Sequence, residues 1–77
     1  MTTEERLKII FSTVMSVSID SVDADSSPSS VPSWTSLRHM NLISAVEEEF
    51  SISLDYAEVM IVVQYELLQQ IVCQKAS

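Results

Sequence analysis

The side chains best able to do chemistry in this sequence gather around one serine. Ser36 carries a hydroxyl, Thr35 precedes it, and His39 follows three residues later. On a helix, residues three apart are neighbours, so Ser36 and His39 have the spacing of a nucleophile and its base in a small hydrolase. That chemistry also requires an orienting carboxylate and an oxyanion hole, and the sequence offers neither at a suitable position. A half-buried packing role for His39 is therefore the better interpretation.

Two other groups of residues could bind a metal or react, but their surroundings in the sequence are unsuitable. Asp20, Asp23 and Asp25 lie close together, but their spacing differs from that of a calcium loop, whose central glycine is also missing. Cys73 has only Lys75 nearby to stabilise a thiolate, which favours a packing role on the last helix. One cysteine and one histidine cannot build a structural zinc site, so no metal site is predicted.

Length and charge argue against several classes of protein. The chain has 77 residues, a formal net charge of −7 and an apolar content of 47%. We expect one domain, residues 1–77, too small to enclose a deep catalytic pocket, which favours a carrying or binding protein over an enzyme. The negative charge disfavours nucleic acid as a partner. The longest apolar run, residues 59–63, is too short to cross a membrane, and no secretory signal is visible. We expect a cytoplasmic monomer.

Apolar periodicity predicts the helices that position Ser36. A first helix begins near Thr3, with Thr2 at its cap, and has one apolar stripe: Leu7, Ile10, Phe11 and Val14. A second helix covers residues 37–50, with Thr35 as its N-cap and Ser36 in its first turn. The apolar face of this helix comprises Met40, Leu42, Ile43, Val46 and Phe50. We expect Met15, Met40 and Met60 to fill the core, with Met40 kept open for another role.

The rest of the chain predicts a loop and two further helices. Residues 16–33 are rich in serine, contain both prolines and form a long loop, which three apolar residues can pin to the bundle: Ile19, Val22 and Val31. The capping-box spacing of Asp55 and Glu58 predicts a short helix from Tyr56. Residues 59–63 fit a helix or turn, because a lone strand would have no partner, and residues 65–74 form a last amphipathic helix. Without glycine, the helices must end on other residues. The predicted fold is all-α, a small four-helix bundle with a long first loop.

Residues 35–50 resemble the second helix of the acyl carrier protein family. Ser36 and Leu37 match the last two residues of the family signature Asp-Ser-Leu, and Glu47, Glu48, Glu49 and Phe50 match its helix end without a gap. The order of helices and the acidic balance extend the resemblance over the whole chain. The resemblance implies a 4′-phosphopantetheine arm on Ser36, installed from coenzyme A by a phosphopantetheinyl transferase. The arm would present acyl or aminoacyl groups to the loading and processing enzymes of fatty-acid-like, polyketide or other specialised biosynthesis.

Two positions depart from the family pattern. Thr35 replaces the signature aspartate. Threonine keeps the capping role, but it lacks the negative charge that helps the transferase in the family. Arg38 and His39 make the following turn neutral to positive, so the acidic density shifts to residues 47–49, which are most often a solvated face. By the resemblance, the arm is flanked by Thr35, Leu37, His39 and Met40, and the candidates for partner docking are Arg38, Glu47 and Glu48.

Two functional hypotheses from different classes follow. In the first, the chain is a carrier, and the unpaired N–H groups and positive dipole end of the helix favour a phosphodiester on Ser36. Arg38 and His39 could add contacts to that phosphate. In the second, the chain is a carrier-like protein-interaction module that no longer bears the arm, as the neutral Thr35 suggests.

Overall fold

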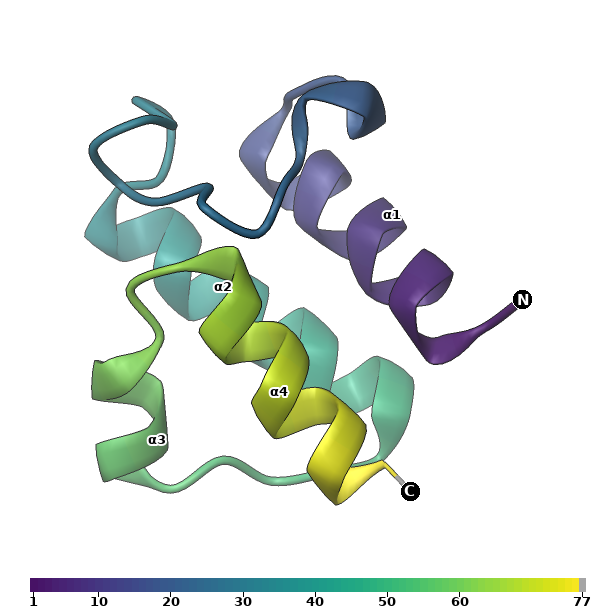
Figure 1. The fold of residues 1–77 in the computed structure, drawn as a ribbon. Helices are drawn as coiled ribbons and strands as arrows, with labels where there is room; N and C mark the ends of the chain where they lie inside the picture. The colour runs from purple at the N-terminus through teal and green to yellow at the C-terminus, as the bar shows by residue number, and fades with distance from the viewer. Residues whose placement is uncertain (77) are drawn as a thin grey trace.

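The computed structural model describes residues 1–76, in which the regular structure is entirely helical. Its elements, drawn in Figure 1, are α1 (Thr3–Met15), the 3₁₀ helix η1 (Ile19–Ser21), α2 (Ser36–Phe50), α3 (Tyr56–Ile61) and α4 (Tyr65–Lys75). No strand is present in residues 1–76. The predicted all-α fold of four helices with a long loop between the first and second is confirmed.

The three predicted N-terminal caps are present. Each cap side chain accepts a hydrogen bond from the backbone N–H three residues later, at Thr2, Thr35 and Asp55. At α3 the capping box is complete, because the Glu58 carboxylate also accepts from the backbone N–H of Asp55 at 3.0 Å. These bonds satisfy donors that the first turn of a helix leaves without partners.

Two serines replace the glycine that commonly ends a helix. Ser16 ends α1 with φ 56°, and Ser51 ends α2 with φ 54°, both in the left-handed region. This conformation costs a non-glycine residue about 1 kcal/mol. In return, the backbone N–H groups of residues 51 and 52 both reach the carbonyl of Glu47, which satisfies an acceptor at the end of α2.

The core is built around Phe11, which lies between two other aromatic rings. Its ring meets those of Trp34 and Tyr65 edge to face, each at 5.2 Å between centroids. The helices surround these rings with buried side chains: Leu7 and Met15 from α1, Leu42, Ile43 and Val46 from α2, and Leu68, Ile71 and Val72 from α4. Met15 is core filler as predicted, but Met40 and Met60 are 53% and 59% exposed, so the prediction that they fill the core is wrong.

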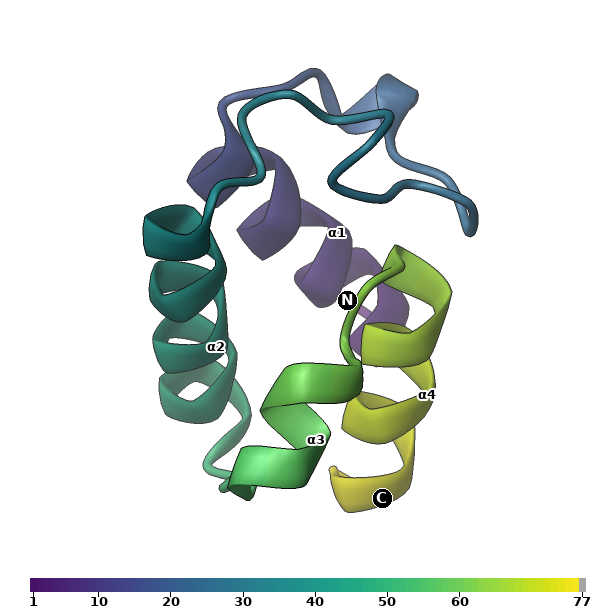
Figure 2. The same cartoon turned by 90° about the vertical axis from the view of Figure 1, so that its left-hand side faces the viewer.

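The long first loop is held in place by backbone contacts to α4. Gln64 caps α4 without a side-chain hydrogen bond. Instead, the N–H groups of Tyr65 and Glu66 donate to the loop carbonyls of Ser26 and Ala24, at 2.8 and 3.2 Å. Figures 1 and 2 show the loop crossing over one end of the bundle. The loop therefore completes the start of α4, a function that no sequence pattern predicted.

Two of the three apolar residues that were expected to hold the loop against the bundle do so. Val22 is buried and Val31 is half-buried against the core. Ile19 is 42% exposed in η1, so the prediction that it anchors the loop is wrong. The Ser33 hydroxyl supplies a further anchor, because it donates to the carbonyl of Met15 at the end of α1 at 2.7 Å.

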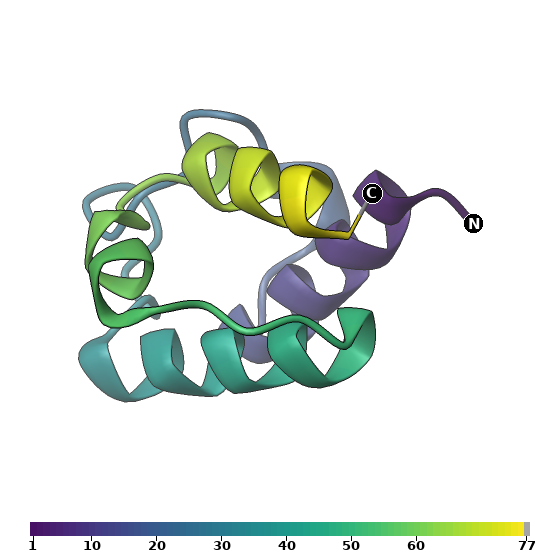
Figure 3. The same ribbon diagram turned by 90° about the horizontal axis from the view of Figure 1, so that it is seen from below.

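The short helix α3 lies at the end of the molecule where α2 begins, as Figures 1 and 3 show. Residues 59–61 are helical, which confirms the prediction of a helix or turn for that part of residues 59–63, and Val62 is buried just beyond the helix. None of the helices in residues 1–76 combines the length and apolarity that crossing a membrane requires. The position of α3 makes it the second wall of the site around Ser36.

Candidate functional site

Ser36 is the first residue of α2, and its side chain is exposed. The capping bond comes from its neighbour, because Thr35 Oγ1 accepts from the backbone N–H of Arg38 at 3.3 Å. The Ser36 hydroxyl makes no hydrogen bond to any side chain or carbonyl of residues 1–76. Since Thr35 does the capping, the alternative that Ser36 serves only as a cap loses its basis, and the hydroxyl is open to an incoming enzyme.

An apolar cavity of about 370 Å³ adjoins Ser36 and opens to solvent. We call it the α2–α3 groove. Its apolar lining comprises Pro28, Trp34, Met40, Val59, Met60, Val62 and Val63. The polar groups at its edge are those of Thr35, Ser36 and His39, and no Asp, Glu, Lys or Arg lines it. The exposed hydroxyl therefore stands beside an uncharged, apolar depression.

His39 links the two walls of the α2–α3 groove. The indole Nε1–H of Trp34 donates to His39 Nδ1 at 3.0 Å, and the two rings stack 6.1 Å apart at 21°. Because indole is only a donor, Nδ1 is the unprotonated nitrogen, and Nε2–H donates to the carbonyl of Val59 in α3 at 3.0 Å. The predicted half-buried packing histidine is confirmed. With both nitrogens engaged elsewhere, the geometry gives no support to a Ser36–His39 nucleophilic pair.

Two other residues of the first turns of α2 differ sharply in their surroundings. Leu37 is 72% exposed and lies beside Ser36 on the outside of the helix. Arg38 is half-buried and turns toward α1, where Nη1 donates to the carbonyl of Val14 at 2.9 Å and to Ser16 Oγ at 3.2 Å. Its charge compensates the negative end of α1, which has no basic residue in its last turn. A contact from Arg38 to a phosphate on Ser36 is therefore without support in this structure.

The glutamates at the end of α2 mostly have structural partners. Glu47 is half-buried, and its carboxylate accepts from the backbone N–H of Leu54 at 2.8 Å. Glu49 pairs with Arg6 of α1 at 2.7 Å, and the Arg6 guanidinium also lies 4.6 Å from the centroid of the Phe50 ring. Glu48 is exposed and has no such partner among residues 1–76. Of this acidic run, one carboxylate is left open for an electrostatic contact.

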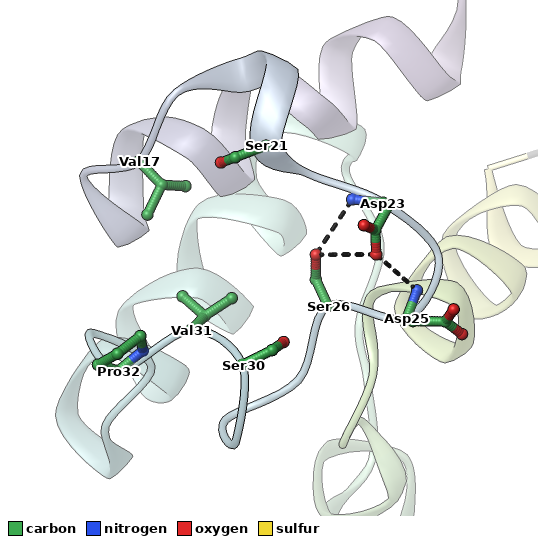
Figure 4. A pocket seen from close by; sticks show the side chains of 8 residues that line it. All are labelled: Val17, Ser21, Asp23, Asp25, Ser26, Ser30, Val31 and Pro32. Atoms are coloured by element: carbon green, nitrogen blue, oxygen red, sulfur yellow. Dashed lines mark hydrogen bonds between the residues drawn. The ribbon is translucent and has the colours of Figure 1, made fainter.

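The aspartates of the long loop organise the loop itself, as Figure 4 shows. Asp23 Oδ1 accepts from the backbone N–H of Asp25 at 2.9 Å, and the buried Ser26 accepts at Oγ from the N–H of Asp23 at 3.0 Å. These residues border a second cavity of about 260 Å³. Within residues 1–76, no three His, Cys, Asp or Glu side chains come together as a set of metal ligands.

The cap at Thr35 provides a direct test of how the site is built. We expect Thr35→Ala to lower the free energy of unfolding by about 1 kcal/mol, because it removes the hydroxyl that accepts from Arg38 N–H. Thr35→Asp keeps a capping acceptor and should stay within about 0.5 kcal/mol of the parent. Urea unfolding followed by circular dichroism measures both. Equal stability of Thr35→Ala and the parent would contradict the assignment of the cap.

The site therefore consists of an open hydroxyl at a helix N-terminus, an apolar groove beside it, and a Trp34–His39–Val59 chain of hydrogen bonds that holds the groove walls together. Comparison with protein-family models and with curated proteins found no match to this chain.

Proposed function

We propose that this chain is a carrier protein whose Ser36 hydroxyl receives a 4′-phosphopantetheine arm from coenzyme A. The observation that carries the proposal is the exposed, unbonded hydroxyl of Ser36 at the first position of α2, beside the α2–α3 groove. The resemblance of residues 35–50 to the acyl carrier protein family supports it. Bound at Ser36, the arm would supply a thiol on a long tether, on which acyl or aminoacyl groups are held as thioesters.

The residues around Ser36 fit a phosphodiester. The N–H groups of Ser36 and Leu37 belong to the first turn of α2, where a helix has no acceptors of its own and carries a partial positive charge. Thr35 is neutral, and the first turn contains no acidic residue. No like charge in this turn therefore opposes a phosphate on the Ser36 oxygen.

The other residues of the site would position the tether and its cargo. The hydrogen bond from His39 to the Val59 carbonyl fixes α3 against α2, so the groove keeps its apolar walls. Those walls shield an apolar group from water at little cost in reorganisation, because the side chains that form them are already in place. The chain itself supplies presentation, and the partner enzymes supply the reactions.

Transfer of the arm to Ser36 is the decisive experiment. The chain is incubated with coenzyme A, magnesium and a broad-specificity phosphopantetheinyl transferase, and its intact mass is measured. We expect the parent to gain one phosphopantetheine and Ser36→Ala to gain none. Ser44→Ala removes another exposed serine of α2 and should react like the parent, which makes it the matched control.

A carrier-like interaction module without the arm is the second candidate, and Thr35 is the observation that favours it. The position before Ser36 lacks the carboxylate of the family signature. If the parent stays unmodified while a housekeeping carrier in the same tube reacts, the carrier proposal is wrong. Gain of the arm by Thr35→Asp alone would then identify a carrier site that has lost its function.

A further inference from the structure

The chain has one histidine and one tryptophan, and the two side chains are hydrogen-bonded to each other. Trp34 is buried at the end of the long loop, and His39 is half-buried near the start of α2. The imidazole also reaches the backbone carbonyl of Val59 in α3. We call these three residues the His39 clasp. A single side chain therefore joins the end of the loop, α2 and α3.

Each bond of the His39 clasp fixes the state of one imidazole nitrogen. Nδ1 carries no proton, because the indole N–H that faces it can only donate. Nε2 carries the proton, because the Val59 carbonyl can only accept. Only the neutral imidazole with its proton on Nε2 satisfies both conditions.

A second proton on the ring would break one bond and keep the other. It would bind at Nδ1, where the new N–H would point at the indole N–H of Trp34 3.0 Å away. Two donors that face each other form no hydrogen bond, so the bond to Trp34 is lost. The bond from Nε2–H to the Val59 carbonyl persists and gains strength, because its donor is now charged.

No charged side chain lines the groove that His39 borders. The titratable side chains of the surrounding segments are Asp20, Asp23 and Asp25 of the loop, Arg38 of α2, Asp55, Tyr56 and Glu58 of α3, and Tyr65 and Glu66 of α4. Arg38 is turned to the end of α1, and Glu58 is paired with Lys75. The charged residues of α1 all precede Ile9, whereas the start of α2 meets the other end of that helix. The response to a proton therefore belongs to the clasp itself.

We propose that the His39 clasp is a proton-driven switch that releases Trp34 while α3 stays bound to α2. Histidine ordinarily changes charge between about pH 5 and 8, and the open groove gives water access to His39. Release frees the indole that forms one wall of the groove, two residues before Ser36. The change is local, because Ser33 still holds the loop to the end of α1. The proposal does not depend on an arm at Ser36.

Nuclear magnetic resonance of the full, ¹⁵N-labelled chain tests the switch directly. One histidine and one tryptophan give side-chain signals that need no further assignment. At about pH 7.5 we expect the His39 proton on Nε2, and toward about pH 5 we expect a second proton on Nδ1. In step with it, protection of the Trp34 indole N–H against exchange, corrected for the intrinsic pH dependence, should fall by about tenfold. The backbone amides of α3 should keep their protection.

Two variants separate the clasp from other titrating groups. His39→Gln keeps an acceptor and a donor on the side chain but cannot titrate, so its indole N–H should lose the pH response. Trp34→Phe removes the donor that opposes the second proton. In that variant His39 should still titrate, while the pH response of the backbone amides of residues 31–35 disappears.

Three results would overturn the switch, and none of them bears on the carrier proposal. The first is an indole N–H whose protection stays constant while His39 gains its second proton. The second is the same loss of protection in His39→Gln, which would assign the response to carboxylates. The third is a His39 that carries its proton on Nδ1 at about pH 7.5, or stays neutral down to about pH 5.

Discussion

The Phe11→Ala variant is expected to be largely unfolded at room temperature. Phe11 is fully buried and touches the rings of both Trp34 and Tyr65 edge to face. Truncating a buried phenylalanine to alanine costs about 3 to 5 kcal/mol, because apolar burial is lost and a cavity remains. A domain of this size has a net stability of about 3 to 5 kcal/mol, so the loss removes most of it. Far-ultraviolet circular dichroism with urea titration gives the folded fraction.

Two further variants separate the aromatic cluster from general effects of mutation. Phe11→Leu keeps most of the apolar volume and is expected to cost about 1 to 2 kcal/mol and remain folded. Ile9→Ala, at a position 42% exposed, should change stability by about 0.5 kcal/mol or less. A cooperative, parent-like transition in Phe11→Ala would show that the three aromatic rings do not organise this core.

The Tyr65→Phe variant is expected to be more stable than the parent by about 1 to 3 kcal/mol. Tyr65 is 2% exposed, and its hydroxyl has no hydrogen-bond partner within residues 1–76. Removing this hydroxyl eliminates the cost of burying a polar group without a partner, while the ring stays packed on Phe11. Tyr56→Phe, at a position 78% exposed, is the matched control and should change little. Urea unfolding at neutral pH measures the three proteins.

The same hydroxyl should make stability depend on alkaline pH. Burial, together with the nearby negative charge of Glu4 and the Cys73 side chain, raises the pKa of Tyr65 from 10.0 to about 12. Because the pKa is lower in the unfolded chain, the unfolded chain loses the Tyr65 proton first as pH rises. The free energy of unfolding is therefore unaffected by this titration below pH 10.0, and it falls as pH rises from 10.0 toward about 12. The loss amounts to about 3 kcal/mol at most.

The stability difference between parent and Tyr65→Phe isolates this contribution, since other groups titrate equally in both proteins. We expect the difference to grow as pH rises above 10.0. A difference that stays constant across the alkaline range would show that Tyr65 ionises equally in the folded and unfolded states.

Local signals in the sequence were sufficient to predict the helices. The caps at Thr2, Thr35 and Asp55 depend on residues three apart, and the helix ends at Ser16 and Ser51 lie where the apolar pattern stops. Such interactions span one helical turn, so the sequence contains all the groups that they need. The start of α2 immediately after Thr35, and with it the place of Ser36, belongs to this class.

These local signals could not predict contacts between segments that are distant in the sequence. The periodicity of α2 put Met40 on the apolar face, but the neighbouring α3 leaves the groove open there, and Met40 remains exposed. Trp34 precedes the helix, so no helical spacing predicted its hydrogen bond to His39. The turn of Arg38 toward Val14 depends on how α1 and α2 pack, and the composition of the turn had suggested an open positive charge instead. Each of these depends on tertiary packing.

If Ser36 is the residue that carries the arm, the modification must lie at that position, and locating it within the chain tests the proposed function. After reaction with coenzyme A and the transferase, the protein is digested and its peptides are fragmented by mass spectrometry. The loop before α2 is rich in exposed serines, among them Ser29 and Ser30, which serve as internal competitors for the same enzyme. We expect one phosphopantetheine per chain, on Ser36 alone. An arm on a loop serine, or on no serine under conditions that modify a housekeeping carrier, would contradict it.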